Sequence, residues 1–180
     1  ALRVVRMGHD RRLRGAGRSG GQVQHQRQAR VIHEGQFGGA GSWKAGLEVE
    51  RRLLIDSMKV DSTQFALRDG SGLSSSNLVS PKAFATLLTW MRAHPRFESF
   101  AAGLPQSGQR GSLKSRFVGT PLEGKVRAKT GSISRVNTLA GYIELPGRTL
   151  TFAVEANNHT LGSRVMIPQI DSLVVQMGKK

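Results

Sequence analysis

The sequence predicts a mixed α/β domain of the α+β kind, in which helices pack on an antiparallel sheet. Three consecutive segments read as strands, namely 125–131, 137–146 and 148–157. The last two are joined by a short Pro-Gly turn, and a helix with one apolar face is expected over 164–177. Strands with such short links pair antiparallel, so we expect an antiparallel sheet. The helix that follows must bury its apolar face, and we expect it to cover this sheet.

Further helices are expected before these strands. Residues 42–58 place apolar side chains at roughly helical spacing with charges between them, which is typical of an amphipathic helix. Residues 64–69 alternate like a short strand. A second helix begins at Pro81, with Ser80 as its N-cap, since proline suits the first helical position. A short helix is predicted within 111–117.

A change of composition near residue 42 divides the chain. Residues 1–41 are rich in Gly, Gln and Arg and show no sustained helical or strand period, so they are predicted to be an irregular basic arm. Within them, residues 1–37 hold eight Arg and two acidic residues, a net charge of +6 out of +15 for the chain. Residues 42–180 are predicted to form the folded part, and 38% apolar residues suffice for one core.

Several kinds of site are excluded by composition. The chain has no cysteine, which rules out disulfides, a thiolate nucleophile and cysteine-bound metals. Its five histidines lack the spacing of a metal site, so no metal or other cofactor is expected. No apolar run is long enough to cross a bilayer, and the first thirty residues lack the apolar core of a secretion signal.

The tripeptide Lys129-Thr130-Gly131 is the strongest sign of chemistry. On a strand, Lys129 and Gly131 point to one face and Thr130 to the other. The ammonium suits an anionic substrate, the hydroxyls of Thr130 and Ser132 can bind a terminal carboxylate, and Gly131 leaves room for close backbone approach. The N–H after the glycine could serve as an oxyanion donor. The alternative is that Lys129 is only a solubilising charge on an edge strand.

Two longer stretches support the catalytic interpretation. Residues 69–81, DGSGLSSSNLVSP, together with AKTGS at 128–132, resemble the class C low-molecular-mass penicillin-binding proteins, the serine D-alanyl-D-alanine carboxypeptidases/endopeptidases. GSWKAGLEVERRLL before the loop and LAGYIELPGRTLTFAVEANN after the tripeptide are also similar, so the resemblance covers about Gly38 to Met177. It implies the C-terminal part of a transpeptidase domain of the penicillin-binding-protein/β-lactamase type.

The resemblance also implies a mechanism built on three elements, S-x-x-K, S-x-N and K-T-G. In that family the serine of S-x-x-K attacks the bond between two D-alanines and forms an acyl-enzyme. Lys129, Thr130 and Gly131 would supply the third element as catalytic residues, and Thr130 and Ser132 would bind substrate. The implied partners are peptidoglycan stem peptides ending in D-Ala-D-Ala, and β-lactams.

Ser75-Ser76-Asn77 spells S-x-N, but its position differs from that of the family's catalytic element, which lies before the GSW helix. We therefore assign the loop a structural role, through turn and cap hydrogen bonds. Its expected structural residues are Asp69, Gly70, Ser71, Gly72, Ser74 and Asn77.

The S-x-x-K element is missing. None of the eight lysines has a serine three positions before it, so the chain carries no such nucleophile and is predicted to be inactive alone. Residues 1–37 occupy the place where the true S-x-N belongs. They are interpreted either as the product of a shifted reading frame or as a genuine basic arm.

The resemblance thus implies part of a serine-type D-Ala-D-Ala carboxypeptidase, with endopeptidase activity on peptidoglycan cross-links as a further expectation, in the periplasm or cell envelope. The alternative is a non-catalytic basic module for nucleic acid or an anionic envelope polymer. Nucleic acid is not the expected partner, because residues 1–37 offer only Phe37 for stacking on bases.

Overall fold

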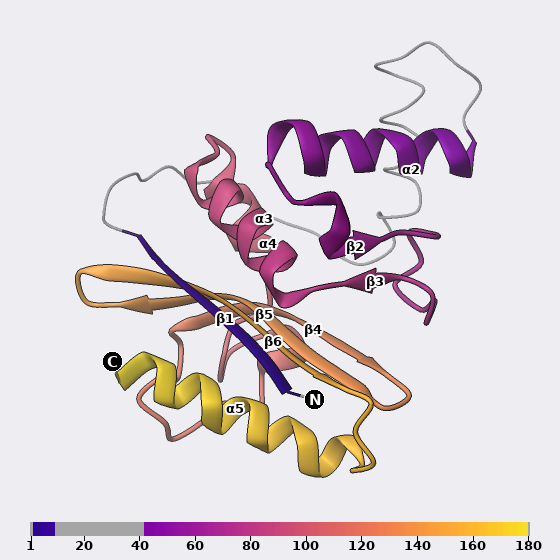
Figure 1. The fold of residues 1–180 in the computed structure, drawn as a ribbon. Helices are drawn as coiled ribbons and strands as arrows, with labels where there is room; N and C mark the ends of the chain where they lie inside the picture. Colours follow the sequence, from indigo (N-terminus) through magenta and orange to yellow (C-terminus); the bar gives the residue numbers. More distant parts are fainter. Residues whose placement is uncertain (1, 10–41, 180) are drawn as a thin grey trace.

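The computed structural model describes residues 2–9 and 42–179, and a four-stranded antiparallel sheet forms its centre (Figure 1). The sheet order is β1-β6-β5-β4. The strands are β1 (Leu2–His9), β4 (Val126–Ile133), β5 (Val136–Leu145) and β6 (Arg148–Asn157). The antiparallel sheet and its three consecutive strands were predicted, and both predictions are confirmed.

Strand β1 corrects part of the predicted irregular arm. It pairs antiparallel with β6 in a register that runs from Leu2 opposite Ala156 to His9 opposite Thr149. Without β1, β6 would be an edge strand with unpaired N–H and C=O groups. Residues 2–9 form backbone hydrogen bonds with those groups. This long-range pairing forms a strand where no local period indicates one. The predicted character of residues 10–41 lies outside the described residues.

Helix α5 (Ser163–Lys179) covers one face of the sheet and confirms the predicted closing helix (Figure 1). The main core lies between them. Its fully or nearly fully buried side chains come from alternate positions of the strands and from one stripe of the helix, among them Val126, Ala128, Leu139, Ile143, Phe152, Val154, Ile170 and Val174. Arg116 and Asp171 form a mostly buried ion pair that fixes α5 to the chain segment preceding β4.

Helices α3 (Pro81–Ala93) and α4 (Phe97–Gly103) lie on the opposite face (Figure 1). Ser80 caps α3 by accepting a hydrogen bond from the N–H of Ala83, as the sequence predicted. Tyr142 of β5 packs against Leu88 and donates its hydroxyl to the Leu88 carbonyl at 2.8 Å. Burial raises the pKa of Tyr142. Helix α4 was not predicted, since seven residues give too short a period to recognise.

A smaller unit lies beyond α3. Helix α2 (Trp43–Arg52) continues through a π-helical turn (Leu53–Ser57), which confirms the helix predicted over 42–58. Strand β2 (Phe65–Ala66), predicted over 64–69, pairs with the unpredicted β3 (Leu78–Val79). A small apolar cluster joins this unit to α3. The helix predicted within 111–117 is a single 3-10 turn (Gly111–Leu113).

Candidate active site

The Lys-Thr-Gly tripeptide lies in β4, the edge strand at the end of the sheet opposite β1. Val126 and Ala128 are buried under α5, so strand alternation places Thr130 and Ser132 on the α5 face as well. Lys129 and Gly131 belong to the opposite face. The tripeptide and Ser132 are all within the strand, which extends two residues beyond its predicted end.

The outer edge of β4 is covered only over its first half. Ser107 donates its N–H to the carbonyl of Val126 at 2.9 Å, and Ala128 donates to the carbonyl of Pro105 at 3.1 Å. Successive residues of a strand direct their backbone groups to opposite sides, so Thr130 and Ser132 also present N–H and C=O away from β5. In the described part of the chain no strand lies beyond β4. Its second half is therefore an open edge with backbone donors and acceptors.

Lys129 lies along this open edge. Its side chain is exposed, and its ammonium donates to the Thr130 carbonyl at 2.7 Å. The cation thus occupies the acceptor that an incoming strand would use. A peptide pairing with β4 would meet the ammonium and the two N–H groups along the edge, with the hydroxyls of Thr130 and Ser132 beside it on the α5 face.

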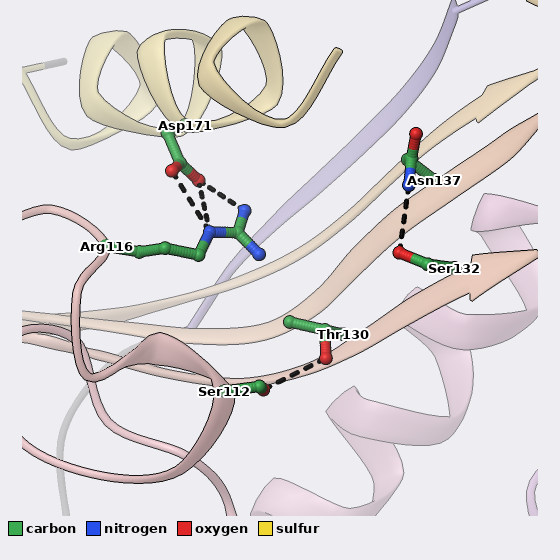
Figure 2. Close-up of polar contacts among 6 residues, drawn as sticks. All are labelled: Ser112, Arg116, Thr130, Ser132, Asn137 and Asp171. Atoms are coloured by element: carbon green, nitrogen blue, oxygen red, sulfur yellow. Dashed lines mark hydrogen bonds and ion pairs between the residues drawn. The ribbon is translucent and has the colours of Figure 1, made fainter. Parts of the chain in front are cut away.

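Both hydroxyls of the motif are held by residues from other elements (Figure 2). Thr130 donates its Oγ1–H to Ser112 Oγ at 2.9 Å, from the 3-10 turn that precedes the strand. Asn137 of β5 donates from Nδ2 to Ser132 Oγ at 2.9 Å and to Ser163 Oγ at 3.1 Å. Sequence reasoning missed Ser112 and Asn137. The register of the β4–β5 hairpin would have revealed Asn137, which stands directly opposite Ser132.

Gly131 is required by the partner strand. It stands opposite Thr138, and a Cβ at Gly131 would collide with the Thr138 hydroxyl oxygen. From the sequence, the expected reason for a glycine at this position is that it lets a substrate approach the backbone closely. Crowding by Thr138 of β5 is an additional reason for glycine here.

The loop between β2 and β3 is held by its own polar side chains. Asn77 accepts from the N–H of Arg68 at 2.6 Å and of Asp69 at 3.2 Å, and donates back to Asp69. The Asp69 carboxylate accepts from the backbone N–H and the hydroxyl of Ser71, which lowers the pKa of Asp69. Gly72 has φ +72, and Ser74 accepts from the N–H of Ser76. A Cβ added at Gly70 would meet no atom within 4 Å apart from those of its chain neighbours.

The described residues contain no group of three or more His, Cys, Asp or Glu that could hold a metal ion. Among the same residues, no helix is both long and apolar enough to cross a membrane.

The comparison with family models decides the family. The model of the D-Ala-D-Ala carboxypeptidase 3 (S13) family matches residues 29–177. The chain belongs to this family. The family match begins before Gly38, where the sequence resemblance was expected to start, and it confirms that resemblance.

Named relatives agree with this S13 assignment. The D-alanyl-D-alanine carboxypeptidase of Actinomadura sp. (strain R39) is 40% identical over 127 residues, covering 68% of this chain and 23% of the relative. The penicillin-sensitive carboxypeptidase A of Dictyostelium discoideum is 31% identical over 158 residues, covering 81% of this chain and 30% of the relative. The chain thus spans between a fifth and a third of the length of these two relatives.

Solved structures confirm the fold of this S13 chain. Penicillin binding protein 4 (dacB) from Haemophilus influenzae, complexed with a novel β-lactam, superposes with a TM-score of 0.74 at 25% identity, covering 86% of this chain and 38% of that one. A second structure of the same protein gives a TM-score of 0.69 at 26% identity, covering 77% of this chain and 31% of that one. The predicted penicillin-binding-protein type of fold is therefore confirmed.

Proposed function

We propose that this chain is part of a serine-type D-Ala-D-Ala carboxypeptidase and supplies the substrate-carboxylate side of its cleft. The observation that carries the proposal is the open half-edge of β4, where Lys129, Thr130 and Ser132 present a cation, two hydroxyls and two backbone N–H groups. A peptide that ends in a D-alanine carboxylate matches this set of donors.

The recognition step follows from strand geometry. A substrate peptide adds to the β4 edge as a further antiparallel strand, and the Lys129 ammonium exchanges the Thr130 carbonyl for the peptide. The Ser132 hydroxyl then donates to the terminal carboxylate, and the Thr130 hydroxyl exchanges Ser112 Oγ for the same carboxylate, both in charge-assisted hydrogen bonds. The N–H of Ser132 faces the same edge and provides one donor for the oxyanion of a tetrahedral intermediate.

The covalent step requires a nucleophile that these 180 residues lack, because no lysine follows a serine at S-x-x-K spacing. The chain alone therefore binds peptide without hydrolysing it. Within the longer family protein, the substrates are peptidoglycan stem peptides in the cell envelope, cross-linked peptides are a further substrate of endopeptidase action, and β-lactams bind at the same edge.

The test is a titration of the ¹⁵N-labelled chain with N-acetyl-D-alanyl-D-alanine and with its C-terminal amide. The acid should shift the backbone amide signals of Thr130 to Ser132 in a saturable way. The amide should bind about tenfold more weakly, because it lacks the charge that the ammonium and hydroxyls recognise. Lys129→Met should reduce this preference. Equal binding of acid and amide, or shifts confined to other strands, would overturn the proposal.

A further inference from the structure

The Asn137 side chain is a buried polar group at the back of the candidate site. It is 1% exposed, and its residue stands opposite Ser132 of β4 and Ala156 of β6. Its amide nitrogen bridges Ser132 Oγ on the edge strand and Ser163 Oγ, the first residue of α5. One side chain thus connects the motif strand, the central strand and the helix that covers them.

The direction of these hydrogen bonds determines where the Ser132 proton is available. An amide N–H can only donate, so Ser132 Oγ accepts from Asn137 and keeps its own O–H for another acceptor. Ser132 is exposed, so that acceptor can come from solution. A carboxylate is an acceptor only, and it therefore matches a hydroxyl whose proton has been left free in this way.

The Asn137 side chain also carries a group that destabilises the fold. The carbonyl oxygen Oδ1 of Asn137 is buried without a hydrogen-bond partner among the described residues. A buried unpaired acceptor destabilises the fold, and an apolar side chain would avoid it. The retained benefit is the pair of N–H bonds to Ser132 and Ser163.

We propose that Asn137 is a positioning residue that sets the Ser132 hydroxyl as a donor toward the substrate carboxylate. The inference rests on the proposed function, because it concerns how the same edge of β4 recognises a D-alanine terminus. Asn137 acts through Ser132 and does not itself touch the peptide.

A double-mutant cycle separates this role from a structural one. The measured quantity is the ratio of the dissociation constants of N-acetyl-D-alanyl-D-alanine and its amide, for the full chain and for Asn137→Ala, Ser132→Ala and the double variant. Asn137→Ala should reduce the preference for the acid about fivefold, which corresponds to the net contribution of one ordinary hydrogen bond. In the Ser132→Ala background the same change should have no further effect, because the hydroxyl on which Asn137 acts is gone.

Two further variants keep the test decisive. Asn137→Asp is nearly isosteric, but its carboxylate accepts the Ser132 proton, so this variant should also lose preference for the acid. In the Ser132→Ala background the same Asn137→Asp change should cause a smaller loss, because the hydroxyl that it misdirects is absent. Ser163→Ala removes the other bond of Asn137 and should keep the preference of the unmodified chain, since it leaves the Ser132 bond in place.

The outcomes distinguish this inference from the function on which it rests. If the unmodified chain shows no preference for the acid, the proposed function is overturned and the inference with it. If the preference is present but Asn137→Ala and Asn137→Asp leave it unchanged, only the inference is overturned. An equal loss with and without Ser132, or an equal loss in Ser163→Ala, would make Asn137 a structural residue and would also overturn it.

Discussion

At the residue scale, Gly131 shows how tightly the motif is built into the sheet. Its missing side chain is what allows Thr138 to lie across from it on β5, because a Cβ would collide with the Thr138 hydroxyl. The clash involves the end of a side chain that can rotate, so the strain is local.

Gly131→Ala should therefore destabilise the chain by about 1–3 kcal/mol, as overpacking does. In a Thr138→Ala background most of this loss should disappear, since the colliding oxygen is gone. Denaturant unfolding of the four chains measures both effects. If Gly131 also leaves space for the substrate, peptide binding should stay weak in the double variant although stability returns, and full recovery of binding would contradict that second role.

Asp69 allows a prediction about pH. Its pKa is lowered, first by the backbone N–H of Ser71 and next by the Ser71 hydroxyl. A carboxyl with a lowered folded pKa stabilises the loop fully above its ordinary pKa of about 3.9, and this contribution is lost as the pH falls through the folded pKa. The loop should be unchanged from neutral pH to about pH 4 and loosen only below that.

Ser71→Ala should raise the pKa of Asp69 toward its ordinary value without reaching it, because the backbone N–H remains. A ¹³C titration of the carboxyl groups measures this. Asp61 is the matched control, since its pKa is lowered in the same manner by the N–H and hydroxyl of Thr63, and it should not respond to Ser71→Ala. An unchanged Asp69 titration in Ser71→Ala would show that the hydroxyl bond is absent in solution.

The sequence predicts the residues that carry the motif but not the residues that hold them. Lys129 to Ser132 stand together in the chain, and their chemical types suffice to suggest carboxylate binding. Ser112 is eighteen residues from Thr130, and its contact depends on how the 3-10 turn folds back onto the strand. Asn137 depends on a two-residue turn with Arg135 at φ +62, which fixes the hairpin register.

At the element scale, the pairing of β4 with β5 positions the candidate site. Gly141 makes this pairing possible, because it stands opposite Ala128 and allows the two backbones to approach closely. A Cβ at Gly141 would lie 2.6 Å from the Cα of Ala128 and would also collide with the Arg127 carbonyl. Both obstacles belong to the backbone, so no side-chain rotation relieves them.

Gly141→Ala should cost about 3 kcal/mol, at the upper end for overpacking, and should weaken peptide binding by displacing β4. Thermal and denaturant unfolding measure the cost. Gly103→Ala in α4 is the control, because no atom lies within 4 Å of its added Cβ and a helical Gly→Ala change stabilises slightly. Equal stability of the two variants would contradict the close approach.

Elements with a clear local pattern were predicted, and those made by distant contacts were not. The helices at 42–58, 81–93 and 163–179 have amphipathic periods or caps that are visible in the sequence. β1 and β3 exist because distant strands offer them partners, and α4 is too short for a period. The two strands are determined by pairing with distant segments, which the local sequence does not show.

At the scale of the whole molecule, we propose that the described chain forms one side of a cleft. Helix α5, the sheet and helices α3 and α4 form three layers, and the motif strand lies at an edge with its outer half open (Figure 1). Large apolar side chains are exposed on the smaller unit, with Trp43 61% and Leu73 77% exposed. The S13 match, the fold and the motif agree on an enzyme family, whereas the S-x-x-K element is missing from these residues.

We propose that this chain recognises a D-alanine carboxylate but contains no acylating serine. Intact-protein mass spectrometry after incubation with benzylpenicillin tests it most directly, because a β-lactam records a competent nucleophile as a stable added mass. We predict an unchanged mass, and no D-alanine released from N-acetyl-D-alanyl-D-alanine in a parallel sample. A mass increase equal to one penicillin molecule would contradict the claim and would reveal a nucleophile within the 180 residues.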